Sequence, residues 1–191
     1  VDSGKIKEIL SQNNKFGDRV VIKPNFQGSS IGISIANRES VEEAIELAFT
    51  YSNEVLVEEY IKGREITVGI LGNRTLPLVE IIPTQDYYNF DCKYTHGQSD
   101  YRVPADIDKD VEEQIKKDAL SIYYLLGCRH YSRVDFLLDE NNNHFLLEVN
   151  TLPGMTPSSL LPKAAESHGM NFDELVETIL KIALIDNDKV L

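Results

Sequence analysis

Residues 133–150, RVDFLLDENNNHFLLEVN, decide how this chain is expected to fold, because two apolar runs flank an Asn-rich turn. Such a pattern predicts an antiparallel β-hairpin. If the turn pairs Asp139 with His144, the same register places Asp135 opposite Glu148. Arg133 then lies opposite Asn150, and because side chains alternate along a strand, all four polar residues share one face. The other face is expected to meet the core through Val134, Phe136, Leu138, Phe145, Leu147 and Val149.

The paired carboxylates of this hairpin need a positive partner. Opposed side chains have Cβ atoms about 5 Å apart, so Asp135 and Glu148 would repel each other. A divalent cation is one solution, because carboxylates and the side-chain carbonyl of Asn150 are hard oxygen ligands that suit magnesium. In the alternative, Arg133 alone neutralises the two acids in a surface cluster. The spacing leaves both possibilities open.

Composition excludes several classes of protein. The chain has 191 residues, 42% of them hydrophobic and 26% charged, which is typical of a globular protein with one or two domains. Its 19 basic and 31 acidic residues give a formal net charge of −12 without a basic cluster, so we expect no nucleic-acid partner. No apolar run of about 18 residues and no secretory leader are present, so we expect no membrane partner.

The sulfur-containing residues bear on location and completeness. The two cysteines, Cys92 and Cys128, form no C-x-x-C pair and no group with histidine. This favours a reducing, cytoplasmic location and argues against zinc. The chain starts at Val1, and its methionines are Met155 and Met170, which indicates a piece of a longer protein.

Helical and strand patterns alternate along the chain and predict an α+β fold with largely antiparallel pairing. Helices are expected over residues 1–13, 40–51, 108–127 and two C-terminal segments, with strands over 18–24, 54–61, 64–71, 76–83 and the two hairpin runs. Residues 84–104 have no clear period and are expected to form a functional or mobile loop.

The helix ends carry specific signals. Ser40 with Glu43 predicts a capping box, and Asn171 with Glu174 predicts the start of the last helix. The helix over residues 108–127 is expected to stop at Gly127. Its apolar side is expected to consist of Val111, Ile115, Ala119, Ile122 and Leu126.

Two other stretches could contact a polyphosphate. Lys23 ends the strand VVIK, and GSSIG at residues 28–32 offers backbone N–H groups and hydroxyls for an anion. A glycine turn and a solvated lysine are the ordinary alternatives, and no Walker A motif is present. Glu58, Glu59 and Glu65 surround a turn at which one acid is expected to point inward, the alternative being a solvated acidic turn.

Taken in chain order, Lys23, GSSIG, EEYIKGRE, DCKY, RVDF and LLEVNTLPGMTPSSL resemble the ATP-grasp superfamily, and within it the D-alanine–D-alanine ligase family. The resemblance covers essentially the whole chain. It implies two α+β subdomains that hold ATP between antiparallel sheets, after an N-terminal domain that has no counterpart here. Residues 1–64 would form the small central subdomain with the Gly/Ser phosphate loop, and residues 65–191 the C-terminal subdomain with the metal and substrate sites.

The resemblance also implies roles for residues at matching positions. Contacts to ATP are implied for Lys23 at the α- and β-phosphates, for the closing loop Gly28, Ser29 and Ser30, for Glu58 and Ile61 at adenine, for Glu65 at ribose, and for Lys93. Asp135, Glu148 and Asn150 would hold two Mg²⁺ ions, or Mn²⁺, with Glu148 bridging. Arg133 and Gly154 would stabilise the oxyanion, Ser159 and Leu160 would bind the second substrate's carboxylate, and Lys93 and Tyr94 would lie on a mobile loop. The implied catalytic set is Arg133, Ser29, Gly154, Lys93 and Tyr94.

The implied reaction joins two D-alanine molecules for peptidoglycan synthesis in the cytoplasm. ATP phosphorylates one D-alanine carboxylate, and the amine of the second attacks the acyl phosphate with phosphate leaving. The Lys93–Tyr94 pair favours an amine nucleophile over D-lactate. The parent protein is expected to be a homodimer, and this chain alone to be weakly active or inactive. The alternatives are another ATP-grasp carboxylate–amine ligase and a nucleotide-binding module without turnover.

Overall fold

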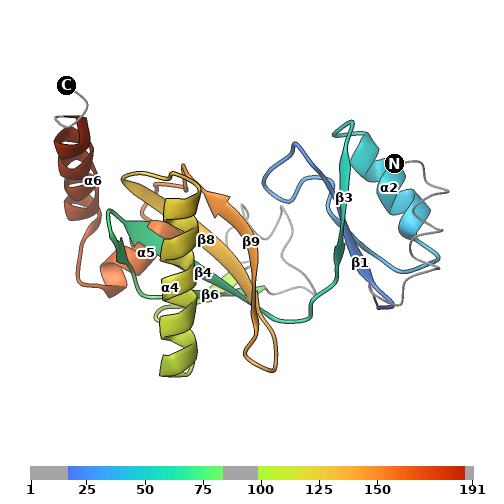
Figure 1. Ribbon diagram of the computed structural model, residues 1–191, viewed down its shortest axis with the longest axis horizontal. Helices are drawn as coiled ribbons and strands as arrows, with labels where there is room; N and C mark the ends of the chain where they lie inside the picture. The colour runs from blue at the N-terminus through green and yellow to red at the C-terminus, as the bar shows by residue number, and fades with distance from the viewer. Residues whose placement is uncertain (1–16, 84–98, 188–191) are drawn as a thin grey trace. The chain divides into compact units, whose positions relative to one another are not determined.

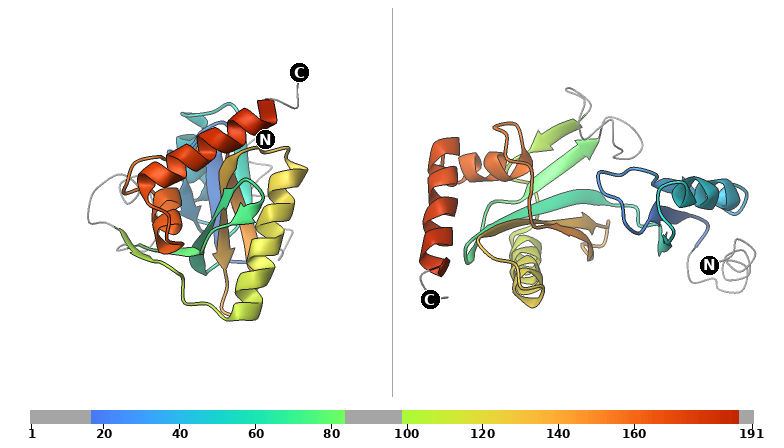
Figure 2. Two further views of the ribbon diagram at one scale, coloured as in Figure 1. Left: turned by 90° about the vertical axis from the view of Figure 1, so that its left-hand side faces the viewer. Right: turned by 90° about the horizontal axis from the view of Figure 1, so that it is seen from above.

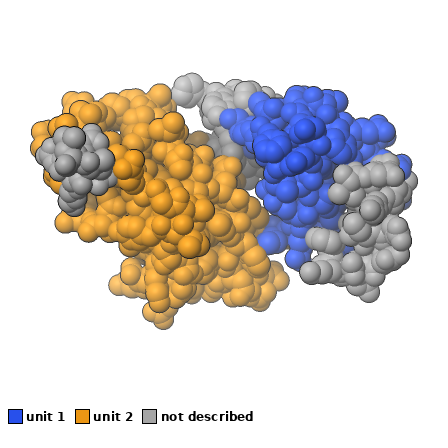
Figure 3. Space-filling view, turned by 45° about the horizontal axis from the view of Figure 1, so that its top comes forward, with its two compact units in different colours: residues 1–61, 83–99 blue, residues 62–82, 100–191 orange. Residues whose placement is uncertain are grey.

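The computed structural model describes residues 17–83 and 99–187, which form antiparallel sheets and helices in the predicted α+β class (Figure 1). The predicted N-terminal helix and the residues Cys92, Lys93 and Tyr94 lie outside the described residues. The chain divides into two compact units, coloured separately in Figure 3: unit 1 contains the residues up to Ile61 together with Pro83–Ser99, and unit 2 contains Lys62–Ile82 and the residues from Asp100 onward. That these units are ATP-grasp subdomains with the bounds 1–64 and 65–191 stays a prediction.

Unit 1 is a three-stranded antiparallel sheet packed on one helix. The strand order is β2 (Ser34–Ala36), β1 (Val20–Pro24), β3 (Val55–Glu59), and the helix is α2 (Val41–Phe49). Alternation along β1 sends its buried residues to the helix and leaves Val21 and Lys23 on the other face. The core consists of Val20, Ile22, Ala36, Val41, Ala44, Ile45 and Ala48.

The predicted capping box of α2 does not form. Ser40 is the N-cap residue, but its side chain makes no capping hydrogen bond. The Asn37 carboxamide oxygen instead accepts hydrogen bonds from the backbone N–H groups of Glu39 and Ser40, both at 3.0 Å. Ser40 Oγ accepts a bond from Asn37 N at 3.1 Å. Ser40 therefore bonds to Asn37, three residues upstream, instead of capping the helix. The spacing of Ser40 and Glu43 alone did not reveal this competing partner.

Unit 2 contains a six-stranded sheet that carries the hairpin. Its strand order is β7 (Ser99–Arg102), β6 (Val79–Pro83), β4 (Arg64–Leu71), β8 (Tyr131–Leu138), β9 (His144–Asn150), and β5 (Arg74–Thr75) pairs with β4. The sequence patterns missed the short strands β5 and β7. Two further helices, α5 (Leu160–Ser167) and α6 (Phe172–Asn187), follow the sheet.

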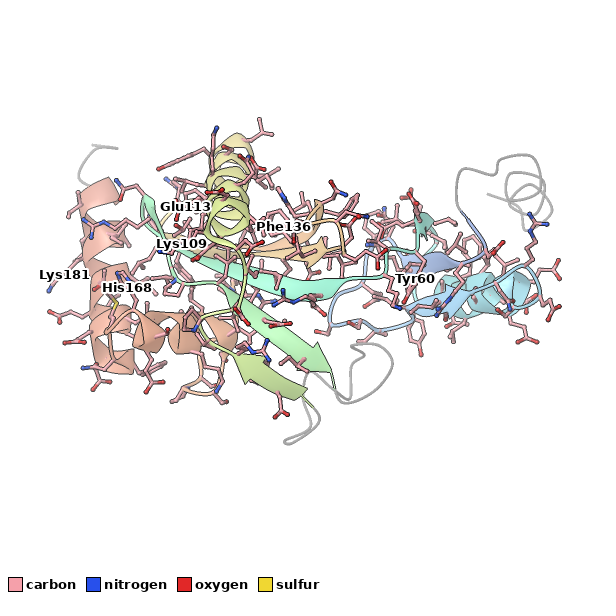
Figure 4. All side chains as sticks on the ribbon, turned by 90° about the horizontal axis from the view of Figure 1, so that it is seen from below. Tyr60, Lys109, Glu113, Phe136, His168 and Lys181 are labelled. Carbon is pink, nitrogen blue, oxygen red and sulfur yellow. The ribbon has the colours of Figure 1, made fainter. Side chains whose placement is uncertain are left out.

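Helices cover both faces of this sheet (Figure 2, right). Helix α4 (Lys109–Leu125) covers one face, where Phe136, labelled in Figure 4, is buried. The core on this side consists of Ile66, Val68, Ile70, Leu78, Ile115, Ala119, Tyr123, Val134, Phe136 and Leu138. On the other face α5 approaches β4, where a Cβ atom added to Gly69 would lie 2.7 Å from Leu161 Cδ1. Gly69 therefore lets α5 pack closely.

The ends of the later helices are largely as predicted. Gly127 stops α4 with a left-handed φ of 67°. Leu126, however, is 60% exposed, and Tyr123 is buried in its place. Leu126 lies beyond the last helical turn, whereas Tyr123 follows Ala119 by one turn. At α6, Asn171 Oδ1 accepts a bond from Glu174 N at 3.0 Å and Glu174 Oε2 accepts one from Asn171 N at 2.9 Å, which confirms the predicted cap.

The hairpin register is confirmed at its polar end and wrong near the turn. Arg133 pairs with Asn150 and Asp135 with Glu148, but the register shifts beyond Asp135, so Phe136 pairs with Leu146 and Leu138 with His144. Such a shift reverses which side chains face the core. Phe145 is therefore 38% exposed rather than part of the core, and the His144 ring lies 5.6 Å from that of Phe136.

Among the residues that the structure describes, none of the helices combines the length and apolarity that crossing a membrane would require.

Candidate active site on the hairpin and the glycine loop

Asp135 is the buried centre of the polar face of unit 2, with 2% of its surface exposed. Arg133 Nε donates to Asp135 Oδ1 at 2.9 Å, and Arg133 Nη2 donates to Oδ2 at 2.8 Å. Thr67, which lies opposite Asp135 on β4, donates its hydroxyl to Oδ1. A bidentate guanidinium and a hydroxyl thus stabilise the buried charge.

Asn150 connects the two opposed acids. Its Nδ2 atom lies 3.1 Å from Asp135 Oδ2 and 3.2 Å from Glu148 Oε1. The repulsion that the sequence predicted between Asp135 and Glu148 is therefore offset by donors of the protein itself. These donors are enough to explain why two acids can lie on opposite strands of the hairpin. A cation at this position is therefore indicated only by the type of ligands that surround it.

The ligands that gather here suit a hard cation. Two carboxylates and one carboxamide lie at adjacent positions on one face of a rigid ribbon, and carboxylate and amide oxygens are what Mg²⁺ prefers. Within residues 17–83 and 99–187, no group of three or more His, Cys, Asp or Glu side chains is placed to hold a metal. The donor set of Asp135, Glu148 and Asn150 fits magnesium and lacks the nitrogen and sulfur ligands that zinc favours.

In unit 1 the structure brings two predicted nucleotide contacts together. Lys23 Nζ lies 2.7 Å from Glu58 Oε1. Lys23 is opposite Leu56 on β3 and Glu58 is opposite Val21 on β1, so the pair is diagonal on the face away from α2. Glu58 is half-buried on this face and Glu59 is exposed, so of the two acids Glu58 is the less exposed, and it does not point toward the core under α2.

The loop after β1 has an unusual backbone. Ser29 and Ser30 both adopt left-handed conformations, with φ of 57° and 60°. Ile31 N donates to the Gly28 carbonyl at 3.2 Å, which closes a tight turn. Two consecutive non-glycine residues in this region cost of the order of 1–2 kcal/mol each, a strain that is concentrated at functional sites.

The remaining predicted residues fall in two further places. Ile61 is the last residue of the first segment of unit 1, and Glu65 lies on the same face of β4 as Thr67, which is opposite Asp135 of β8. After β9, Gly154 lies against Ser159, because an added Cβ atom would come within 2.9 Å of Ser159 Oγ. Thr156 N donates to the same Oγ at 3.1 Å, and Leu160 begins α5.

Sequence reasoning missed an ionic cluster in unit 2, in which one buried acid has two more exposed arginine partners. Glu80 on β6 accepts bonds from Arg64 Nε at 2.7 Å and Nη2 at 2.8 Å, and Arg102 Nη1 lies 3.2 Å from its Oε2. The Arg64 hydrogen bonds lower the pKa of Glu80 below its ordinary value, and the pKa of Arg64 is raised. In the sequence, the available signal for this cluster was an acid, Glu80, inside the apolar run LVEII. In the same way, Thr67 inside REITVGIL was the signal for the hydroxyl that contacts Asp135.

Comparison with known proteins places the chain in a family. The family described as "D-ala D-ala ligase C-terminus" matches residues 3–181. A D-alanine–D-alanine ligase of Geobacter sulfurreducens is 46% identical over 167 residues, which cover 86% of this chain and 53% of the relative. One from Buchnera aphidicola is 43% identical over 175 residues, with 91% and 57% covered.

Solved structures of D-alanine ligases are also similar to this chain. The D-alanine–D-alanine ligase of Bacillus anthracis has a TM-score of 0.82 at 32% identity, covering 95% of this chain and 60% of that one. The VanG D-Ala:D-Ser ligase of Enterococcus faecalis gives 0.81 at 33%, with 94% and 52% covered. The Bacillus anthracis ligase complexed with ATP gives 0.74 at 30%, with 92% and 54% covered.

This chain therefore spans little more than half the length of its curated relatives. The match of residues 3–181, the shared fold and the identities above 40% establish membership. The chain belongs to the D-alanine–D-alanine ligase family, within the ATP-grasp fold, and corresponds to its C-terminal part.

Proposed function

We propose that the protein carrying this chain is an ATP-dependent ligase that joins two D-alanine molecules through an acyl phosphate, for peptidoglycan precursor synthesis in the cytoplasm. The observation that carries the proposal is the polar ribbon of Arg133, Asp135, Glu148 and Asn150, together with the relatives named D-alanine–D-alanine ligase. A nucleotide binder without turnover would have no need of an arginine to stabilise an oxyanion.

Seven residues and one residue outside the described part of the chain are proposed to contact ATP. Lys23 would neutralise phosphate charge, and the backbone N–H groups of Gly28, Ser29 and Ser30 would close over the phosphates. Glu58 and Ile61 would meet the adenine, and Glu65 the ribose hydroxyls. The 2.7 Å contact with Glu58 supports this, since it holds the Lys23 ammonium on the face of β1 that is turned away from α2. Lys93 would add a further contact to ATP.

Asp135, Glu148 and Asn150 are proposed to hold two Mg²⁺ ions, with Mn²⁺ as a substitute. Bound there, the ions would supply positive charge next to the transferring phosphoryl group. The protein's own contribution is rigidity: Thr67 and Arg133 hold Asp135 in one orientation, and β9 fixes Glu148 opposite to it.

Arg133 and Gly154 are proposed to stabilise the oxyanion that forms when an amine attacks the acyl phosphate. Fixed donors aimed at developing charge are among the largest contributions to catalysis. Ser159 and Leu160 would bind the carboxylate of the second substrate through the hydroxyl and the N-terminal N–H groups of α5. The close packing of Gly154 on Ser159 supports this, since the residues proposed for the two roles are neighbours. Ser29, Lys93 and Tyr94 complete the proposed catalytic set.

The proposed function is tested by phosphate release from Mg-ATP in the full-length protein that carries this chain. We expect release that depends on D-alanine and is absent with L-alanine, and we expect this chain alone to be weakly active or inactive. Equal release with L-alanine, or none with D-alanine, would reject the assignment.

A second candidate is a ligase with a different second substrate. The D-Ala:D-Ser ligase matches this chain with nearly the same TM-score as the D-alanine–D-alanine ligase, 0.81 against 0.82. Mass spectrometry of the products formed from D-alanine mixed with D-serine or D-lactate would distinguish these activities. We propose D-alanine as the preferred nucleophile and a homodimer as the working form, and sedimentation of the full-length protein would test the latter.

A further inference from the structure

We propose that the Asn150 carboxamide bridges Asp135 and Glu148 as a hydrogen-bond donor when no cation is bound, and turns over to present its oxygen when the cation enters. The bridge would keep the site folded without a cation, and the turn of the amide would convert the cation-free site into the cation-bound one. It rests on the proposed metal-binding function of these residues.

The direction of the amide follows from its surroundings. Nδ2 lies 3.1 Å from Asp135 Oδ2 and 3.2 Å from Glu148 Oε1, and ionised carboxylates accept hydrogen bonds only. With the amide reversed, its oxygen would face two carboxylate oxygens, Asp135 Oδ2 and Glu148 Oε1. The N–H donors of Asn150 therefore stand between the two acids in this structure.

Asp135 has little remaining capacity to accept a ligand. A carboxylate offers about four lone-pair positions. Oδ1 accepts bonds from Arg133 Nε and from the Thr67 hydroxyl, while Oδ2 accepts bonds from Arg133 Nη2 and Asn150 Nδ2. A cation can reach Asp135 only if one of these four donors withdraws.

Asn150 is the donor that withdraws most easily. Its bond to Asp135, at 3.1 Å, is longer than the two Arg133 bonds at 2.9 Å and 2.8 Å. The arginine is bidentate, and releasing it would break two charge-assisted bonds. A half-turn of the Asn150 amide removes one donor and brings an oxygen ligand to the same place without moving the strand. Aspartate could supply the oxygen but not the donor, which gives a physical reason for an amide at this position.

Thermal unfolding of the chain with EDTA tests the donor role. Asn150→Asp replaces the bridging donor with a third carboxylate, so we expect its Tm to fall by roughly 5–10 °C. Asn73→Asp, which makes the same charge change at an exposed turn of unit 2, should stay within about 2 °C. Equal Tm values for the two variants with EDTA would overturn the inference.

The second arm adds Mg²⁺ with a non-hydrolysable ATP analogue. We expect Asn150→Asp to gain more in Tm than the unchanged chain, because a cation then separates the three acids. Asn150→Leu, which supplies neither donor nor ligand, should lose Tm with EDTA and not recover. A gain for Asn150→Asp no larger than that of the unchanged chain would contradict the exchange.

A measurement on the unchanged chain avoids any folding defect. The side-chain ¹⁵N–¹H signals of Asn150 should shift when Mg²⁺ and the analogue are titrated, while those of Asn141 in the hairpin turn stay in place. Binding of Mg²⁺ without a shift at Asn150 would sink the inference and leave the proposed function intact. No binding of Mg²⁺ or nucleotide by the unchanged chain would instead count against the proposed function.

Discussion

Lys23 and Glu58 form an ion pair across two neighbouring strands of unit 1, with 2.7 Å between Nζ and Oε1. The two residues are diagonal rather than opposed, because Lys23 pairs with Leu56 and Glu58 with Val21. Their side chains are 21% and 41% exposed, so the pair contributes only about 0–1 kcal/mol to folding. The pair matters mainly for orientation, because Glu58 holds the Lys23 ammonium that we propose contacts the phosphates.

Replacing Lys23 by methionine should therefore affect binding much more than stability. We expect the affinity for a Mg–ATP analogue, measured by calorimetry, to fall about tenfold or more, the loss of one charge-assisted contact. Lys181→Met, which removes an exposed lysine that is also paired at 2.7 Å, is the matched control and should bind normally. Unchanged affinity in Lys23→Met would remove this residue from the proposed site.

Stability should fall in acid because the pKa of Glu80 is lowered in the folded protein, chiefly by its hydrogen bonds with Arg64. A lowered folded-state pKa contributes stability above the unfolded-state value, which is ordinarily 4.5, and that contribution is lost as the pH falls below it. Glu80→Gln should lower the free energy of unfolding at pH 7 by about 1 kcal/mol: Glu80 is buried, but the Arg64 and Arg102 side chains are 39% and 51% exposed, so solvent screens their loss of a charge partner.

Urea titrations at neutral pH and below pH 4 would measure this effect. The deficit of Glu80→Gln should shrink in acid, where Glu80 itself becomes protonated. Glu113→Gln removes a carboxylate whose side chain is 76% exposed and should follow the unchanged chain at both pH values. A deficit that is equal at both pH values would mean that Glu80 contributes through packing rather than charge.

Two buried hydroxyls of the same sheet should respond in opposite directions to removal. Among the described side chains, Ser132 Oγ is the buried polar atom that lacks a hydrogen-bond partner, whereas Thr67 donates to Asp135. Ser132→Ala should leave stability unchanged or raise it by up to about 1 kcal/mol. Thr67→Val should lower it by about 1–2 kcal/mol. Denaturant unfolding of the two variants side by side checks the prediction, which a loss in Ser132→Ala would refute.

Gly63 should not tolerate a side chain. A Cβ atom there would lie 2.6 Å from the Leu138 carbonyl oxygen and 2.9 Å from its carbon, and backbone atoms cannot rotate away. We expect Gly63→Ala to lower the free energy of unfolding by about 1–3 kcal/mol. Gly28→Ala, where no atom lies within 4 Å of the added Cβ, should change stability by less than about 0.5 kcal/mol. Equal Tm values for Gly63→Ala and Gly28→Ala would show that the backbone at Gly63 can move away from Leu138.

Patterns that depend on chain neighbours could be predicted. The alternation of RVDFLLD and HFLLEVN was enough to place Asp135 opposite Glu148 and to put Arg133 and Asn150 on the same face. The stop at Gly127 and the cap at Asn171 also follow from a few adjacent residues. In these cases the interacting groups are close in sequence or joined by a short turn, so few alternatives compete.

Contacts between distant segments were decided only by the tertiary structure. Thr67 reaches Asp135, and Arg102 reaches Glu80, because separate strands pair in one sheet, and no local period records that pairing. The shift beyond Asp135 likewise exposes Phe145, since one extra residue in a strand reverses its faces. By itself the sequence determined which polar groups lie together on the hairpin, through the strict alternation of an extended chain. Which donors satisfy them was settled by the strands packed alongside, because a buried charge takes its partners from whatever lies within hydrogen-bond reach in space.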